Sequence, residues 1–121
     1  MTGEQWYAML DVHLTAPFRI LRAAQPVIRS LVKADGDADV RNVRKVVNIS
    51  SVAGLFDNAD QANYSTAKAG VTGLTRTLAK EWGRLQTTVN CVAFGFIKTR
   101  LTEATAVAAQ IATIEGREIK V

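Results

Sequence analysis

The chain has 121 residues, of which 48% are hydrophobic, and a formal net charge of +4. This length allows at most one domain, with a core of its own, and no apolar run reaches the roughly 18 residues that span a bilayer. The basic residues are scattered and not interleaved with aromatic ones, so nucleic acid is not expected as a partner. The single cysteine, Cys91, allows no internal disulfide, and a cytoplasmic location is the expectation.

The first predicted element is a long helix over residues 4 to 31. Thr2 and Gln5 can form a capping box at its start. Pro17 and Pro26 are expected to interrupt and bend it. Apolar residues recur at intervals of three and four, as on one face of an amphipathic helix: Leu14, Phe18, Leu21, Ala24, Ile28 and Leu31.

A polar, charged segment from Asp35 to Arg44 predicts an exposed loop, to which we assign no function. The loop is followed by a short β-branched run, Val46, Val47 and Ile49. Because this run shows no clean alternation, it predicts a strand covered on both faces, as in a parallel sheet.

The strand ends at Ser50, Ser51 and Gly54, residue types that favour turns. Ligands of open α/β sheets collect at the carboxyl ends of strands. Ser51 therefore stands where chemistry is expected, although strand-end serines are more often simple turn formers.

The next predicted element is a helix over residues 62 to 84, in which Tyr64 and Lys68 share one face. A nearby ammonium favours the phenolate form, which makes a tyrosine a better acid–base catalyst near neutral pH. Ser51 could then hold a carbonyl oxygen while Tyr64 gives or takes a proton, so only a hydride donor is lacking. An isolated pair of this kind is more often a half-buried ring and a solvated charge.

The same helix carries an apolar stripe that predicts core or subunit interface: Val71, Leu74, Leu78 and Trp82. Gly70 and Gly73 are expected to allow the close approach of another backbone, and Gly83 marks the end of the helix. A second buried strand over residues 88 to 92 completes a βαβ unit. Both long helices carry more apolar surface than a small sheet needs, so self-association is expected.

Two consecutive motifs carry a family resemblance: Asn-Ile-Ser-Ser-Val-Ala-Gly at residues 48–54 and Gln-Ala-Asn-Tyr-Ser-Thr-Ala-Lys-Ala-Gly at residues 61–70. They resemble the short-chain dehydrogenase/reductase family, and the thirteen positions from Ser51 to Tyr64 match its bacterial 3-oxoacyl reductases. The resemblance implies an α/β fold with part of a Rossmann-like, doubly wound parallel sheet. It also implies a homo-oligomer, either a dimer or a tetramer.

The activity implied by the resemblance is NAD(P)-dependent interconversion of a carbonyl and a hydroxyl, with a 3-oxoacyl or 3-hydroxyacyl thioester as substrate. Ser51 would orient the carbonyl and Tyr64 would be the general acid/base. Lys68 would tune the tyrosine and hold the nicotinamide ribose of NADP or NAD. No metal site is predicted.

The chain departs from the family pattern at His13, where most relatives carry an asparagine that helps to hold a proton-relay water. His13 either fills the same space and bonds to a neighbouring backbone group, or replaces the relay contact, since imidazole both accepts and donates a proton. After the second strand, the resemblance implies cofactor contacts at Gly95, Ile97 and Thr99. It also implies a helix-like segment over residues 103 to 114 that covers the substrate.

The family's glycine-rich turn, Thr-Gly-x-x-x-Gly-x-Gly, has no counterpart among the eight glycines. We therefore expect residues 1–121 to be a partial domain that holds the catalytic half of the fold, with a sheet truncated at both ends. Such a chain is expected to have little dehydrogenase activity by itself. The alternative hypothesis is a non-catalytic remnant that acts as an oligomerisation module.

Overall fold

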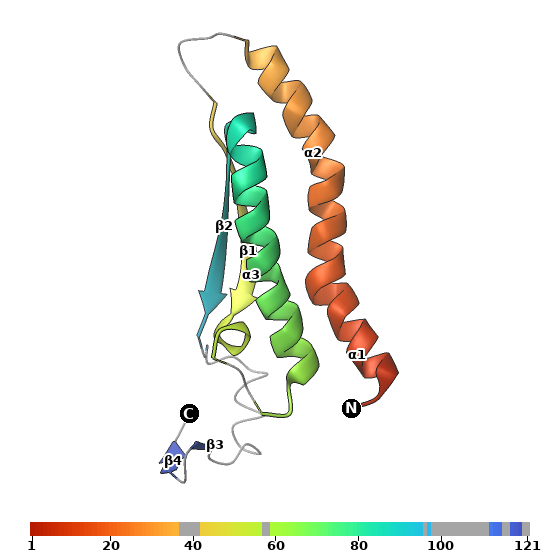
Figure 1. Cartoon of the computed structure of the whole chain (residues 1–121), viewed down its shortest axis with the longest axis vertical. Coiled ribbons are helices and arrows are strands. Elements are labelled where there is room, and N and C mark those ends of the chain that lie inside the picture. Colours follow the sequence, from red (N-terminus) through yellow and green to blue (C-terminus); the bar gives the residue numbers. More distant parts are fainter. Residues whose placement is uncertain (37–41, 57–58, 96, 98–111, 115–116, 120–121) are drawn as a thin grey trace.

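The computed structural model describes residues 1–36, 42–56, 59–95, 97, 112–114 and 117–119 (Figure 1). Within these ranges, no helix is both long and apolar enough to cross a membrane. The first helix, α1 (Gly3–Leu10), begins with the predicted capping box. The Thr2 hydroxyl oxygen accepts the Gln5 N–H at 3.2 Å, and the Gln5 side chain accepts the Thr2 N–H at 2.8 Å. This prediction is confirmed.

A π-helical turn, Asp11–Thr15, joins α1 to α2 (Ala16–Asp35). In it, the Ala16 N–H bonds to the Asp11 carbonyl, five residues back instead of four. Pro17 follows directly and has no N–H to give to the carbonyl four residues before it, so the α-helical ladder cannot continue unchanged here. The predicted helix is thus one helical run with a wider turn near its first proline.

The second proline, Pro26, lies inside α2 without ending it. The expected interruption at this position is therefore wrong. Packing explains how the helix tolerates the loss of one bond, because Leu21 and Ile28 on either side of Pro26 contact the core. Tertiary contacts of this kind routinely override a local propensity.

The centre of the molecule is a parallel pair of strands, β1 (Arg44–Ser51) and β2 (Thr87–Phe94). The helix between them, α3 (Ala62–Trp82), begins near the carboxyl end of β1 and runs back along the sheet (Figure 1). It ends at a 3₁₀ turn, Gly83–Leu85, as the position of Gly83 predicted. The predicted βαβ unit is therefore present.

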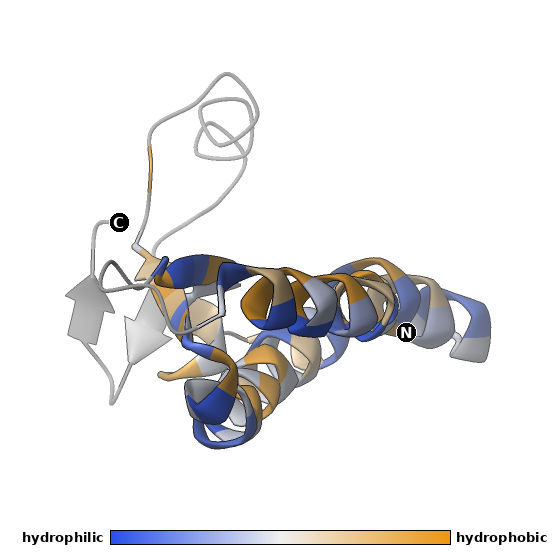
Figure 2. Cartoon of the chain, turned by 90° about the horizontal axis from the view of Figure 1, so that it is seen from above, coloured by the Kyte–Doolittle hydropathy of each residue, from blue (hydrophilic) through white to orange (hydrophobic). Residues whose placement is uncertain are grey.

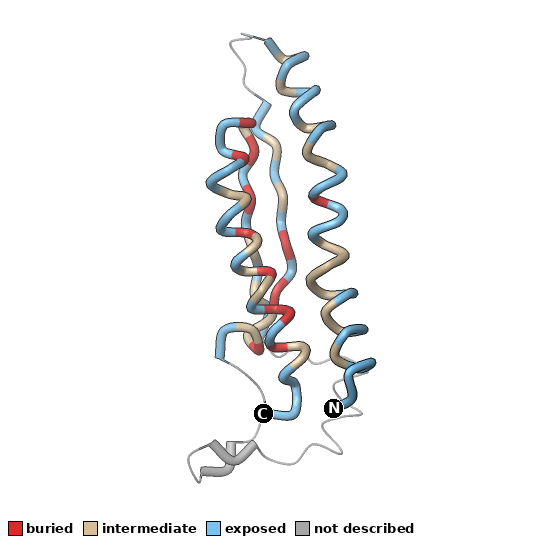
Figure 3. The backbone as a smooth tube through the Cα atoms, turned by 45° about the vertical axis from the view of Figure 1, so that its right-hand side comes forward, coloured by how far each residue is buried: buried red, intermediate tan, exposed pale blue. Residues whose placement is uncertain are grey.

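The core lies between the helices and one face of this sheet (Figure 3). The apolar stripe predicted on α3 belongs to it, with Val71 and Trp82 buried and Leu74 and Leu78 packed partly buried beside them. The buried members of the main cluster join α2, α3, the 3₁₀ turn and β2: Leu21, Trp82, Leu85 and Val89.

In the described part of the chain, the other face of the sheet is uncovered. Four apolar side chains point to it, with exposed fractions of 55% for Val47, 50% for Ile49, 40% for Val92 and 48% for Phe94. Burial therefore alternates along β1, and the prediction of a strand covered on both faces is wrong for the chain as it stands. The β-branched run fits a doubly covered strand, but the described residues supply a covering layer on one face only.

Apolar and polar residues are mixed along the helices (Figure 2). The helix α2 carries apolar residues on two sides. One set, which includes Leu21 and Ile28, packs on the core. A second set at spacings of seven and four is exposed: Ile20, Val27 and Leu31. The predicted single stripe is therefore wrong in part, because Leu31 belongs to this second, outward set. We call Ile20, Val27 and Leu31 the outer stripe.

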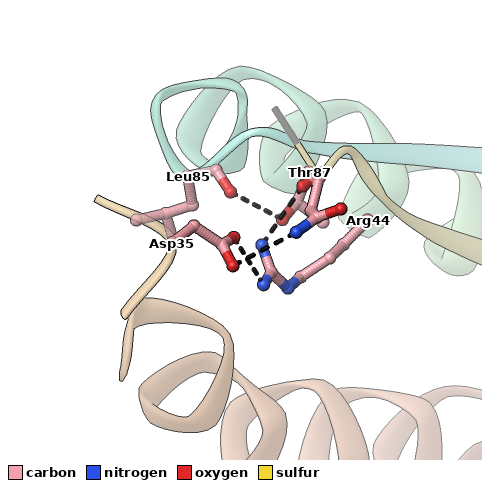
Figure 4. Close-up of polar contacts among 5 residues, drawn as sticks. Asp35, Arg44, Leu85 and Thr87 are labelled. Atoms are coloured by element: carbon pink, nitrogen blue, oxygen red, sulfur yellow. Dashed lines mark hydrogen bonds and ion pairs between the residues drawn. The ribbon is translucent and has the colours of Figure 1, made fainter. Parts of the chain in front are cut away.

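The segment predicted as an exposed loop is anchored at both ends (Figure 4). Asp35 is the last residue of α2 and Arg44 the first of β1, and their side chains form an ion pair at 2.8 Å. Asn42 donates a further bond to the Asp35 carboxylate at 3.3 Å. The bonds from Arg44 and Asn42 lower the pKa of Asp35. The loop prediction is thus wrong at its two ends, which are only partly exposed, and residues 37–41 lie outside the described residues.

Near the end of the chain, two short strands, β3 (Ala112–Ile114) and β4 (Arg117–Ile119), pair antiparallel. The helix-like prediction for residues 103 to 114 is therefore wrong at 112–114. Its earlier part, residues 103–111, lies outside the described residues.

Candidate active site

The candidate site lies where the carboxyl end of β1, the first turns of α3 and the π-helical turn meet. Ser51 is the last residue of β1 and the N-cap of a 3₁₀ turn, Val52–Gly54. Its hydroxyl oxygen accepts the Ala53 N–H at 3.2 Å. This bond fixes the oxygen and leaves the hydroxyl proton available to donate to a substrate atom.

Tyr64 and Lys68 lie together on α3, as their spacing predicted. The Lys68 ammonium is 5.5 Å from the centre of the Tyr64 ring and donates a hydrogen bond to the Ile49 carbonyl at 3.0 Å. Lys68 is only 7% exposed, whereas Tyr64 is half-buried. The helix thus places a nearly buried cation beside a phenol. The carbonyl that this cation contacts belongs to Ile49, two residues before Ser51 on β1.

His13 of the π-helical turn contacts the same phenol from another side. The two rings meet edge to face, with centroids 5.2 Å apart and planes at 87°. Burial, and then the nearby Lys68 charge, lower the pKa of His13 below its ordinary value of 6.5. The neutral imidazole is therefore favoured at neutral pH. Both roles predicted for His13, filling the space of the family's asparagine and relaying a proton, stay predictions.

The predicted cofactor contacts after β2 are partly described. Gly95 directly follows Phe94, which is the register partner of Ser51, so it lies at the same edge of the sheet. A Cβ at Gly95 would meet nothing within 4 Å. Ile97 is exposed, and Thr99 lies outside the described residues.

Polar contacts beneath the site tie β1 to α3, and sequence reasoning missed them. The Ser50 hydroxyl donates to the Lys68 carbonyl at 2.8 Å, and the Asn48 amide donates to the Thr75 hydroxyl at 2.9 Å. The available signal was the doubled serine, because alternation along a strand places one serine on each face. Their partners on α3 could not be read from the sequence.

A further contact missed by sequence reasoning joins α1 to the start of α3. The Asn63 amide donates to the Gln5 carbonyl at 3.1 Å, beside an open groove that His13 also lines. The side-chain oxygen of Asn63 accepts the Tyr64 N–H at 2.8 Å. This asparagine therefore connects the helix that carries His13 to the helix that carries Tyr64.

Comparison with known proteins identifies the class. A family model described as short chain dehydrogenase matches residues 1–109. The chain is 44% identical over 103 residues to the 3-oxoacyl-[acyl-carrier-protein] reductase of Synechocystis sp., covering 85% of this chain and 38% of that protein. It is 39% identical over 104 residues to the reductase of the same name from Vibrio cholerae, covering 86% and 38%.

Among solved structures, a short chain dehydrogenase from Mycobacterium avium is similar, with a TM-score of 0.68 and 39% identity over 78% of this chain and 31% of that one. The chain belongs to the short-chain dehydrogenase family. The predicted α/β class, with part of a Rossmann-like parallel sheet, is confirmed. The chain spans 38% of the length of each of these two reductases.

Proposed function

We propose that the protein is an NAD(P)-dependent oxidoreductase that interconverts a carbonyl and a hydroxyl, with 3-oxoacyl or 3-hydroxyacyl thioesters as substrates. One observation carries the proposal: the ammonium of Lys68 lies 5.5 Å from the Tyr64 ring at the end of the strand that holds Ser51. Family membership supports the reaction class. The names of the two bacterial reductases support the thioester class.

In this proposal, the Ser51 hydroxyl donates a hydrogen bond to the substrate carbonyl oxygen and fixes its position. Tyr64 gives its phenolic proton to that oxygen during reduction and takes one back during oxidation. The nearby Lys68 ammonium stabilises the negative charge left on the phenol, and the low exposure of Lys68 strengthens this interaction. The edge contact with His13 limits the positions that the Tyr64 ring can take.

The proposed cofactor is NADP or NAD, whose nicotinamide supplies or accepts the hydride when bound. The residues present fit its nicotinamide end. The Lys68 ammonium has three N–H donors, and in the described part of the chain one hydrogen bond, to Ile49, is recorded for it. Its other donors can bind ribose hydroxyls, and Gly95 leaves open space beside the end of β2.

We further propose that the protein forms a homo-oligomer in the cytoplasm. The outer stripe supports association, because exposed apolar residues aligned along a helix commonly mark interfaces. The single cysteine agrees with a reducing compartment.

The proposed function is tested by following NADPH and NADH absorbance while a form of the protein that also carries the family's glycine-rich turn acts on a short 3-oxoacyl thioester. That turn is not among residues 1–121, which by themselves are expected to show little of this activity. We expect oxidation of at least one cofactor that depends on the thioester, and the reverse reaction with the 3-hydroxyacyl product. Ser51→Ala, prepared in parallel, should lose about a hundredfold to a thousandfold in rate, as expected for a lost donor to a reacting oxygen. A rate that Ser51→Ala leaves unchanged would show a contaminating enzyme, and absence of any reaction would refute the proposal.

A further inference from the structure

Lys68 is tied to β1 at both its main chain and its side chain. Its carbonyl accepts the Ser50 hydroxyl at 2.8 Å, and its ammonium donates to the Ile49 carbonyl at 3.0 Å. Two consecutive strand residues therefore hold one helix residue through bonds of opposite direction. Ser50 is 3% exposed, so water cannot readily replace its hydrogen bond.

The backbone at Gly54 packs closely against the backbone of α3 beside this contact. A Cβ at Gly54 would lie 2.6 Å from the Lys68 carbonyl carbon and 2.7 Å from the Ala69 nitrogen. The turn that follows Ser51 thus packs directly on the same peptide group that Ser50 holds. Packing fixes the distance between the two backbones, and the hydroxyl bond fixes where α3 lies along the strand.

We propose that Ser50 is a positioning residue, whose hydroxyl sets the place of Lys68 and Tyr64 relative to Ser51. Ser51 is its direct neighbour in sequence and points to the other side of the strand. Any shift of α3 along β1 therefore changes the separation between the serine and the phenol–ammonium pair. The catalytic meaning of this placement rests on the proposed function.

The chain contains a matched control for a merely structural role. The Asn48–Thr75 bond, at 2.9 Å, joins the same strand and helix and is equally buried, but Thr75 lies two helical turns beyond Lys68. If these bonds served stability alone, breaking either one would have the same effect on the site. If Ser50 positions Lys68, the position of the Lys68 ammonium should change when the Ser50 hydroxyl is removed, but not when the Asn48–Thr75 bond is broken.

The first test needs no activity. Ser50→Ala and Thr75→Val are made in the intact protein, and the lysines are methylated reductively and quantified by mass spectrometry. The exposed Lys80 of α3 serves as the internal reference. We expect Ser50→Ala to raise the labelling of Lys68 relative to Lys80 about tenfold, the change that loss of one buried hydrogen bond produces. Thr75→Val should leave that ratio within about twofold of the wild type.

The second test uses the proposed reaction, assayed in the form of the protein that also carries the family's glycine-rich turn. Ser50→Ala should lower kcat about tenfold to a hundredfold while KM for the thioester stays nearly constant, because misplacement by about 1 Å affects the reacting geometry more than binding. Ser50→Cys has a similar size and a weaker donor, so it should give intermediate values. Equal Lys68 labelling in Ser50→Ala and Thr75→Val would overturn the positioning role. A wild type without reductase activity would refute the proposed function, while the labelling ratio still decides the role of Ser50.

Discussion

At the residue scale, Lys68 carries a charge into a nearly buried position where no carboxylate of the described chain pairs with it. Burial of a charge is costly, and a carbonyl bond to Ile49 and the nearby Tyr64 ring offset it only in part. Such a residue is poorly explained by stability. A role in which the ammonium meets a phenolate and a polar ligand explains its place better.

His13 gives a prediction about pH at this scale. Its pKa is lowered in the folded chain, so between that value and 6.5 the unfolded chain binds more protons than the folded one. Stability should therefore fall as the pH drops through 6.5 and level off below the folded pKa. The other groups that meet His13 are the Tyr64 ring and the Lys68 charge.

Urea unfolding between pH 7.5 and 5 checks this, with His13→Gln as the control. His13 is the chain's one histidine, so no second imidazole titrates over the same range. The wild type should lose more stability on acidification than His13→Gln does. Parallel curves for the two proteins would mean that His13 has the same pKa folded and unfolded.

At the element scale, two glycines with different surroundings give opposite expectations. A Cβ at Gly54 would collide with the backbone of α3, so Gly54→Ala should destabilise the protein by about 1–3 kcal/mol. A Cβ at Gly73 would meet nothing within 4 Å, so Gly73→Ala should stabilise α3 by about 0.5–1 kcal/mol. Chemical denaturation of both variants measures the two effects.

The result at Gly73 also tests an expectation from the sequence. Gly70 and Gly73 were both expected to meet another backbone, but a Cβ at Gly70 would approach the Leu14 side chain at 2.9 Å, and Gly73 faces open space in this chain. If Gly73→Ala destabilises the assembled protein, a second subunit packs closely there. If it stabilises, the glycine has no close neighbour.

Local periodicity explains how much of the fold could be predicted from the sequence. The strand–helix–strand order and the shared face of Tyr64 and Lys68 depend on spacings of two and 3.6 residues within one element. The π-helical turn could not be predicted, because a proline such as Pro17 can be accommodated by a bend, a break or a wider turn. The bond from Ser50 to Lys68 spans eighteen positions and depends on how the helix lies along the strand.

The two-sided covering predicted for β1 was wrong for a different reason. The run of Val46, Val47 and Ile49 fits a strand between two layers, and the number of layers is a property of the whole fold. In this chain α2 and α3 cover one face, while Val47 and Ile49 stay exposed on the other. The strand was predictable from local sequence, but its surroundings were not.

At the scale of the whole molecule, the outer stripe predicts self-association. Val27 lies at its centre and is 58% exposed. Val27→Lys should reduce the molar mass measured by light scattering at micromolar concentration, because it introduces a charge into the contact. Ser30→Lys adds the same charge to an exposed position off the stripe and should leave the molar mass unchanged. A monomeric wild type, or dissociation by both variants, would contradict the proposal.

Proton transfer by Tyr64 is tested most directly by Tyr64→Phe, with Tyr7→Phe as the control. Both variants remove one phenolic hydroxyl, and these are the chain's two tyrosines. Tyr7 is exposed on α1, whereas Tyr64 contacts both His13 and Lys68. In the cofactor-linked thioester assay, Tyr64→Phe should lower kcat about a hundredfold to ten-thousandfold with folding intact, and Tyr7→Phe should match the wild type. If Tyr64→Phe kept more than about a tenth of wild-type kcat, a loss smaller than general acid–base catalysis accounts for, Tyr64 would not be the proton donor.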